Sequence, residues 1–557
     1  MAMKKRLLTG LWLVVSAVWA VAAEDLPDVE AAIPAPVKAL GQPTMMDFPG
    51  GIQMAVSAAT EGAQAHCNQG LNHLHGGWEF EASRHFAAAM REDPECLLAH
   101  WGMIMTLLNP SPETGMARNA ATDRLLYLID QGKGTELERG YAYGLIKYIE
   151  NGPLGGASAF RKIANQFPND LQAGVFAALF GRGGYDADGA AMPDQLAAEK
   201  DLLELSRKNP LSPVPLTALL TIRADGTDLT DSLELARKLN QMVPDYAPHL
   251  HLLGHYEWRC GQHAAAAETF GRACALFQTW MKDNNANIAD CPEWGKAECY
   301  RIVALVSNGD FATAYTAARR VAATPLPRDR PSSAGTRFLL WDAMTLPARL
   351  MIQHGQRGNA NEAAASLPKP DAIKESRKHS LAYLWMDGLR LALDAQRLID
   401  AGNLSAAREV VTALTQHGES MVKTQAAAAE SGERASWTRA FRALEILASD
   451  VRGRLAMAGP IKQRDAAYNW FSSATDRQHP ASMLYPPMLL TPMAAHLGGY
   501  FLASKKPAEA IEAYQRALAA FPNDLTALGG LQQAYKAADQ PDHAAAIEKQ
   551  IKKLKGE

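Results

Sequence analysis

The chain has 557 residues, a formal net charge of −3 and 21% charged residues, and only 7% of its residues are aromatic. A chain of this length does not bury one compact core, so it forms either several domains or an array that grows by stacking. Its basic clusters are short, such as residues 4–6 and 552–553, which argues against a nucleic-acid-binding protein with a basic face.

The first residues have the pattern of a secretory signal peptide. The positive residues 4–6 precede an apolar run over 7–20, and Ala22 and Ala23 supply small residues for cleavage. We therefore expect cleavage near Ala22 and Ala23, a periplasmic location, and no stable membrane span after cleavage. The alternative is a single membrane anchor, for which this apolar run is short.

The pattern then changes several times along the chain. Residues 24–60 are rich in proline, which predicts an extended or partly ordered lead-in segment. Helical hairpins are expected over 61–320, an irregular helical region over 321–480, and terminal repeats with a polar cap over 481–557. Within the irregular region, residues 338–353 predict one helix. No segment has the two-residue period of a strand, so the predicted fold is all-α.

Stretches far apart in the chain fit one helix–turn–helix template of about 34 positions. Glycine stands at template position 8 and an aromatic residue at position 24 in four pairs, which are Gly70 and Phe86, Gly144 and Phe160, Gly254 and Phe270, and Gly498 and Tyr514. Such units cannot bury their apolar faces alone, so they stack into a solenoid with a concave surface.

On these residues the chain resembles a broad family of exported bacterial tetratricopeptide-repeat proteins. The resemblance is carried by residues 68–102, 251–267 and 497–535. It departs from the family after the second block, where Cys291 and Pro292 stand in place of a Tyr/Pro/His-Asn run. The family is defined by repeats and not by a reaction. The resemblance therefore implies a non-enzymatic scaffold that binds a protein or peptide partner through its concave surface.

Nine of the 15 histidines gather in two short windows with cysteines nearby. His251 and His255 are four residues apart, as are Cys96 and His100, and this spacing places two ligands on one helix face. The alternative function is therefore a Zn or Cu protein that uses these four residues. Helix-packing histidines, each hydrogen-bonded, are the competing interpretation.

Three residues of the first window are candidates for lining the partner groove. His66 and His73 lie two turns apart on one face of the first expected helix, and Trp101 follows in the next repeat. Aromatic residues of a solenoid also commonly fill its core, which is the alternative for Trp101.

Six cysteines in an exported protein permit disulfides. Cys67 lies near the base of a first helix and Cys96 lies just before the next, so this pair is the disulfide candidate, with buried free thiols as the alternative. Cys260 and Cys274 are expected at opposite ends of a helix pair, too far apart to bond.

Signatures of catalysis are missing from the sequence. It contains no Gly-x-Ser-x-Gly elbow, no phosphate-binding loop and no dinucleotide fingerprint followed by strands. We therefore expect no catalytic residues and no organic cofactor. An enzyme with acid and base groups in 321–480 is the third alternative, without a residue pair to support it.

Overall fold

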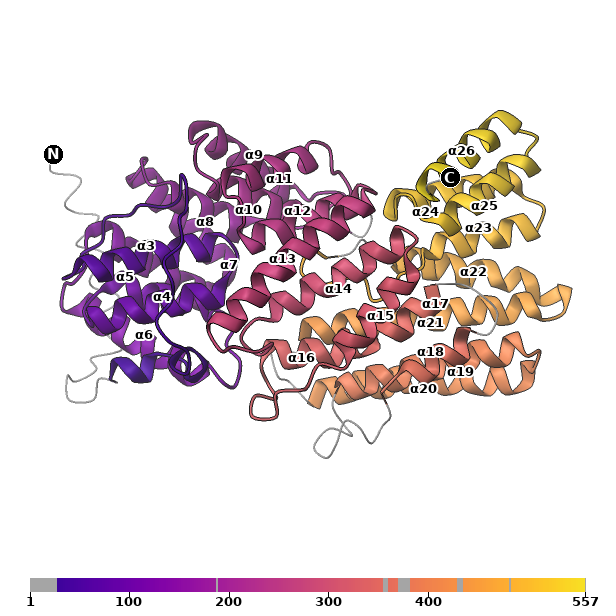
Figure 1. Ribbon diagram of the computed structural model, residues 1–557, viewed down its shortest axis with the longest axis horizontal. Helices are drawn as coiled ribbons and strands as arrows, with labels where there is room; N and C mark the ends of the chain where they lie inside the picture. Colours follow the sequence, from indigo (N-terminus) through magenta and orange to yellow (C-terminus); the bar gives the residue numbers. More distant parts are fainter. Residues whose placement is uncertain are drawn as a thin grey trace. The chain divides into compact units, whose positions relative to one another are not determined.

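The computed structural model describes residues 28–186, 189–353, 359–368, 381–427, 434–479 and 482–555. Figure 1 shows that this part of the chain is built from helices, most of which pair with their neighbour in sequence. It holds no β-strand, and only an isolated bridge joins Tyr185 to Ala191. The prediction of an all-α fold is confirmed. The signal-like residues 1–23 lie outside the described residues.

The chain divides into two compact units. Unit 1 comprises residues 1–182 and 197–218, and unit 2 comprises residues 183–196 and 219–557. Helices α9 (Pro193–Lys208) and α10 (Val214–Arg223) contribute residues to both units. The division into segments that the sequence suggests stays a prediction.

Unit 1 is a series of helical hairpins. Besides its parts of α9 and α10, its elements are η2 (Val29–Ala32), α2 (Ala35–Lys38), α3 (Glu61–His75), α4 (Glu79–Glu92), α5 (Leu97–Thr106), α6 (Gly115–Asp130), α7 (Glu136–Gln166) and α8 (Leu171–Gly181). The helix α7 is itself a hairpin, because Gly152 has a φ of 70° and precedes Pro153, which cannot continue a helix.

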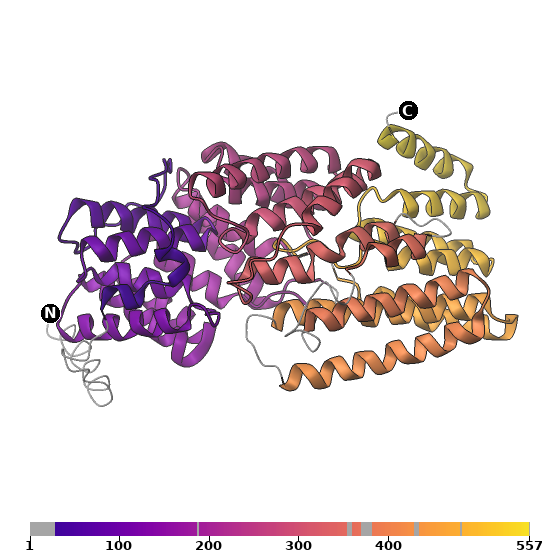
Figure 2. The same cartoon turned by 60° about the horizontal axis from the view of Figure 1, so that its bottom comes forward.

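Unit 2 continues with longer hairpins. Its elements are α11 (Ser232–Met242), α12 (Ala247–Arg259), α13 (His263–Asp283), α14 (Pro292–Ser307), α15 (Phe311–Ala322), α16 (Ala334–Trp341), η3 (Ala343–Thr345), α17 (Leu346–Gln353), α18 (Asn359–Ser366), α19 (Leu381–Asp400), α20 (Leu404–Ala427), α21 (Arg434–Ala458), α22 (Ile461–Arg477), α23 (Met493–Ala503), α24 (Pro507–Ala520), α25 (Leu525–Ala537) and α26 (Pro541–Lys555). Figure 2 shows the long orange helices α19 to α22 lying side by side. Across the described ranges, none of the helices combines the length and the apolar character that crossing a bilayer requires.

One contact between a glycine and an aromatic ring recurs in both units. The ring of Phe86 lies so close to Gly70 and Gly102 that a Cβ on these glycines would stand 2.7 and 2.3 Å from ring atoms. The same close approach joins the other predicted pairs, which are Gly144 and Phe160, Gly254 and Phe270, and Gly498 and Tyr514. A larger residue at template position 8 would push its two helices apart, because helix interfaces are close-packed.

The prediction of one helix over 338–353 is wrong. The chain leaves α16 at Trp341, passes through η3 and enters α17 at Leu346. At the break, the buried carboxylate of Asp342 lies 3.7 Å from Arg349 and 3.2 Å from Arg439. A buried carboxylate without a partner is costly, so this pairing stabilises the break in the helix.

Candidate functional site

Residues 42–59 of unit 1 form a non-helical segment with one turn at Pro49 and Gly50, which we call the lead-in strap. It follows the short elements η2 and α2 and ends where Thr60 caps α3. Ile52 and Met54 are buried, whereas Gln53 and Ala55 between them are exposed. This alternation is that of an extended chain with one face against the protein.

Two amide side chains of α3 each bind both backbone groups of one strap residue. Asn72 accepts a hydrogen bond from the N–H of Ile52 at 2.7 Å and donates one to its carbonyl at 3.1 Å. Gln69 accepts from the N–H of Met46 at 3.2 Å and donates to its carbonyl at 2.6 Å. These contacts involve only the backbone of the strap, so they do not depend on which side chains it carries.

Asn68 and Gln64 continue this pattern toward the start of α3. Asn68 accepts from the N–H of Met54 at 2.9 Å, while Gln64 accepts from the N–H of Val56 at 2.9 Å and donates to the carbonyl of Met54 at 2.7 Å. Four residues of a helix advance by about 6 Å and two residues of an extended chain by about 6.6 Å. Because these steps nearly match, positions 64, 68 and 72 meet residues 56, 54 and 52 in order. We call these three positions the amide ladder.

The strap also contacts α7 and α8. The backbone N–H and the hydroxyl of Ser57 donate to the carboxylate of Glu138, at 3.2 and 2.8 Å. The amide of Gln172 donates to the sulfur of Met54 at 3.5 Å. The strap therefore covers a face of unit 1 to which three helices contribute.

The three residues expected in a partner groove are buried. His73 and Trp101 have no exposed surface, and His66 is 9% exposed. The indole of Trp101 donates to the carbonyl of Tyr141 at 3.0 Å, within the aromatic core of unit 1. The ring of His73 meets Phe48 of the strap edge-on, with centroids 5.0 Å apart. None of the three residues lines an open groove in this structure, because Trp101 is a core residue and His73 lies against the strap. Their contact with a partner stays a prediction.

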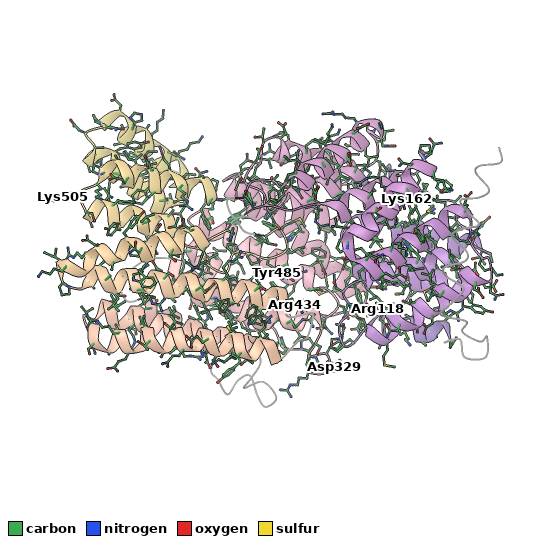
Figure 3. All side chains as sticks on the ribbon, turned by 180° about the vertical axis from the view of Figure 1, so that it is seen from behind. Arg118, Lys162, Asp329, Arg434, Tyr485 and Lys505 are labelled. Atoms are coloured by element: carbon green, nitrogen blue, oxygen red, sulfur yellow. The ribbon has the colours of Figure 1, made fainter. Side chains whose placement is uncertain are left out.

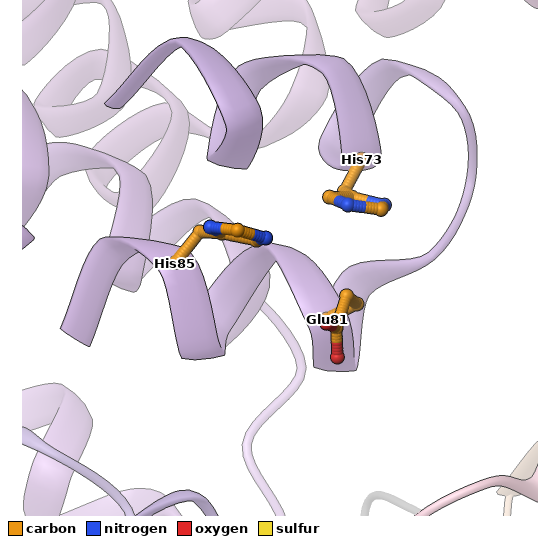
Figure 4. A group of neighbouring side chains, drawn as sticks. All are labelled: His73, Glu81 and His85. Carbon is orange, nitrogen blue, oxygen red and sulfur yellow. The ribbon is translucent and has the colours of Figure 1, made fainter. Parts of the chain in front are cut away.

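His73, Glu81 and His85 form a compact cluster between α3 and α4 (Figure 4), with ligand atoms all within 4.8 Å of one another. His66 joins it, with its Nδ1 at 3.0 Å from Nδ1 of His85. The carboxylate of Glu81, however, forms a buried ion pair with Arg84 at 2.7 Å. This guanidinium supplies the positive charge that a metal ion would bring, so the cluster is already balanced in charge.

Burial keeps the histidines of this cluster neutral. It lowers the pKa of His73 to about 3, with the charge of Arg84 acting in the same direction. Burial also lowers the pKa of His85 far below its usual range. The rings of His73 and His85 stack with centroids 5.2 Å apart, as neutral aromatic groups do.

Residues 482–491 of unit 2, which we call the connector, join α22 to α23 without forming a helix. Side chains from several helices donate hydrogen bonds to its carbonyls. The hydroxyl of Tyr300 donates to the carbonyls of Ser482 and Tyr485, and Nε2 of His251 contacts the carbonyl of Met483 at 2.9 Å.

Two arginines hold the middle of the connector. Arg349 donates to the carbonyl of Pro487 at 2.9 Å, and Arg439 donates to that of Pro486 at 3.0 Å. Both guanidinium groups share the carboxylate of Asp342. The connector is therefore fixed by charged and aromatic groups of the interior of unit 2.

The predicted metal ligands of unit 2 face backbone carbonyls. Nε2 of His251 contacts the carbonyl of Met483 in the connector, and Nε2 of His255 contacts the carbonyl of Ala224 at 3.2 Å. Both rings pack against Tyr300, with centroids 5.7 and 5.6 Å from its ring. The spacing of four residues does place them on one helix face, but it is a packing face.

The predicted ligands of unit 1 have local partners as well. Nε2 of His100 contacts the carbonyl of Pro94 at 2.9 Å. The sulfur of Cys96, the residue that precedes α5, lies 3.6 Å from that of Cys67 in α3. These contacts do not favour the metal-binding alternative.

Cys67 and Cys96 are in contact as thiols in the buried part of unit 1. The hydrogen bond with Cys96 raises the pKa of the Cys67 thiol, and burial raises it further. The predicted disulfide between them stays a prediction, since it requires the two sulfurs to approach by less than about 2 Å.

Comparison with models of protein families finds no match, and comparison with curated proteins finds none. Among solved structures, the chain is similar to the human IFIT1 dimer with PPP-AAAA, with 13% identity and a TM-score of 0.34 over 75% of this chain and 90% of that chain. It is also similar to yeast Tom70, with 11% identity and a TM-score of 0.25 over 89% of this chain and 93% of that chain. A third similar structure is the APC/C hetero-tetramer Cut9–Hcn1, with 12% identity and a TM-score of 0.23 over 75% of this chain and 87% of that chain. Similarity at this level assigns no function. The helical hairpins and their recurring glycine–aromatic contact give this chain a tetratricopeptide-type solenoid fold.

Proposed function

We propose that this protein is a non-enzymatic scaffold that binds an extended stretch of a partner polypeptide on the strap face of unit 1. The observation that carries the proposal is the amide ladder, in which Gln64, Asn68 and Asn72 bind the backbone of an extended segment. A peptide that leaves water must find partners for its N–H and carbonyl groups, and the ladder supplies them.

The strap is the resident occupant of this face, so a partner segment has to replace it. Each hydrogen bond contributes only about 0.5–1.5 kcal/mol net, and a replacing segment would form the same bonds. Replacement of the strap by a partner segment therefore leaves few hydrogen-bonding groups of the ladder without a partner. The binding free energy would then come from the partner's apolar side chains in the places of Ile52 and Met54, which are both 6% exposed.

The proposed site of action is the periplasm, and the proposed partner is an exported protein. This rests on the signal-like pattern of residues 1–23. Cell fractionation of the full-length chain, with the N-terminal sequence of the mature protein, tests this part separately. Retention of residues 1–23 in the cytoplasmic fraction would contradict it.

A synthetic peptide with the sequence of residues 44–58 is the direct probe of the strap face. We expect it to bind in trans to a full-length Ile52→Asp, Met54→Asp variant, whose own strap is destabilised, at least about tenfold more tightly than to the wild-type chain. Fluorescence anisotropy of the labelled peptide measures this. Adding Asn68→Ala and Asn72→Ala to the variant is expected to abolish binding, because two rungs of the ladder are then lost.

The matched control is the same peptide with N-methyl groups on the backbone nitrogens of Ile52 and Met54. It keeps every side chain but cannot donate the two hydrogen bonds, so we expect it not to bind. Equal binding of the methylated peptide would show that the backbone is not what is recognised. Circular dichroism of each variant verifies that the helices are retained.

A further inference from the structure

Unit 2 contains a cavity of about 600 Å³ beside the connector. It is lined by Thr438, Arg439 and Arg442 of α21, by Tyr485 of the connector, and by Asp186 and Asp225 from loops of unit 2. Pockets that bind small ligands have volumes of about 300–1,000 Å³, so this cavity has room for a ligand of a few residues or fewer.

The wall formed by α21 carries more positive than negative charge. Asp342 is the shared carboxylate of two guanidinium groups, those of Arg349 and Arg439, whose side chains are 1% and 20% exposed. One carboxylate cannot neutralise both, so one positive charge is left over behind the cavity.

One further cation, Arg442, adds to this charge. Arg442 is exposed at the cavity and forms no ion pair or hydrogen bond with any described residue. The ring of Tyr485 (Figure 3) has the guanidinium carbon of Arg439 4.2 Å from its centroid and the amine of Lys296 5.4 Å from it. These contacts fix Tyr485 and Arg439 in place, while Arg442 retains its five N–H donors for a ligand.

The remaining lining of the cavity includes apolar residues. Ile446 of α21 and Met488 and Leu489 of the connector are 4%, 8% and 8% exposed. A ligand that fits this cavity therefore needs an apolar part as well as an anionic group, because an inorganic anion would leave the apolar surface uncovered.

We propose that this cavity binds an organic carboxylate with an apolar body, either a free small molecule or the carboxyl terminus of a peptide. Arg442 contacts the carboxylate, because a guanidinium group binds a carboxylate through two parallel hydrogen bonds. Arg439 supplies fixed positive charge beside it. The site lies wholly in unit 2 and does not depend on the strap face.

Calorimetric titration of the full-length chain with acetyl-Leu-Leu tests the proposal, with the same dipeptide as its carboxyl-terminal amide as the comparison. We expect the free acid to bind at least about tenfold more tightly than the amide. N-acetylleucine distinguishes the two sources of the carboxylate. Equal affinity for it indicates a small-molecule site, and weaker affinity indicates a site for chain ends.

The variant Arg442→Gln is expected to weaken binding of acetyl-Leu-Leu by about tenfold or more, since a charge-assisted pair is lost. Arg434→Gln is the matched control, because Arg434 is an exposed arginine of the same helix that does not line the cavity, and we expect no change. Equal binding of acid and amide, unchanged binding by Arg442→Gln, or no binding at about 10 mM would each overturn the proposal.

Discussion

The lead-in strap of unit 1 and the connector of unit 2 are both non-helical segments bound by side chains through their backbones. The amide ladder binds the strap at N–H and carbonyl groups alike, with neutral side chains of one helix. The bonds to the connector from Tyr300, His251, Arg349 and Arg439 all go to its carbonyls, and they come from several helices.

Charged groups meet the strap near its ends, where Arg84 binds the carbonyl of Gln42, Glu138 binds Ser57 and Asp93 binds the N–H of Ala59. Between residues 52 and 56, neutral amides on one helix can release a segment and accept a similar one. Buried charges that converge from several helices cannot, because each would lose its partner.

The comparison therefore separates an exchangeable segment from a structural one. The strap presents Gln53 and Ala55 to solvent, so one edge of it is open to competition. The ring of Tyr485 in the connector contacts two cations, and the connector's carbonyls accept hydrogen bonds from the buried Arg349 and the half-buried Arg439. Perturbing the connector should destabilise unit 2 more than perturbing the strap destabilises unit 1, and the following predictions test this difference.

The largest loss of stability should come from lowering the pH, because both units contain buried histidines. Burial lowers the pKa of His73 to about 3 and of His75 to about 4 in unit 1, and it lowers the pKa of His249 to about 3 and of His251 to about 4 in unit 2. In the unfolded chain these four rings take up protons near pH 6.5, whereas in the folded chain the same rings bind no proton until the pH is near 4. The stability they contribute is complete above about pH 6.5 and is lost as the pH falls toward 4.

Each such ring costs about 1.4 kcal/mol per pH unit within this window, so a few together approach the whole stability of a domain. Urea unfolding followed by tryptophan fluorescence between pH 7.5 and 4.5 measures the loss. The variant His249→Phe should reduce the slope of the free energy of unfolding against pH by the contribution of one histidine. An unfolding midpoint that is the same at pH 7 and pH 5 would contradict this account.

Removing Arg349 should be the most harmful single substitution among those that affect the connector. Arg349→Met leaves Asp342 with Arg439 alone and the carbonyl of Pro487 without its donor. Breaking a buried pair of this kind costs about 3–5 kcal/mol. Guanidinium unfolding of the full-length chain measures the change in the free energy of unfolding.

The control for Arg349→Met is Arg272→Ala. Arg272 pairs with Asp245, and both side chains are largely exposed, so its removal should change stability by less than about 1 kcal/mol. Similar losses for the two variants would mean that the connector does not depend on its buried arginines.

Oxidation of Cys67 and Cys96 should stabilise unit 1. Two thiols 3.6 Å apart can lose two protons and two electrons to a thiol–disulfide oxidant such as oxidised glutathione and form one bond. The bond should add about 2–4 kcal/mol to the free energy of unfolding, which a reductant removes. Mass spectrometry of unreduced proteolytic fragments detects the cross-link. Full labelling of both thiols after denaturation of the oxidised protein would contradict the prediction.

The smallest effect is expected in the amide ladder. Asn72→Ala removes both bonds to Ile52 in a buried setting, which should cost about 1–3 kcal/mol. Gln69→Ala removes the equivalent pair at a half-buried position and should cost less, while Asn119→Ala, at an exposed position, is the control. Hydrogen exchange of residues 44–58 locates the effect. Faster exchange in Asn119→Ala than in Asn72→Ala would refute the ladder.

The repeat register was predictable because it is local. Gly70 and Phe86 lie in neighbouring helices of one hairpin, and their contact follows from the template. His251 illustrates the limit, because its acceptor, the carbonyl of Met483, is 232 residues away and no spacing within the helix reveals it. The sequence does contain a signal for the strap face. Gln64, Asn68 and Asn72 follow one another at intervals of four residues, directly after a segment that the prolines predict to be extended.

The near match between helix and extended chain also limits how long a segment one helix can hold. The two steps differ by about 0.6 Å per rung, so the error reaches nearly 2 Å after about three rungs. A hydrogen bond tolerates a spread of only about 0.5 Å in its donor–acceptor distance. The ladder can therefore follow an extended chain for only a few rungs. In this structure the strap passes from Gln64 of α3 at Val56 to Glu138 of α7 at Ser57. A partner motif read by the amide ladder alone would span only about six residues, and a motif that continues past Val56 must bend toward α7 to be read further.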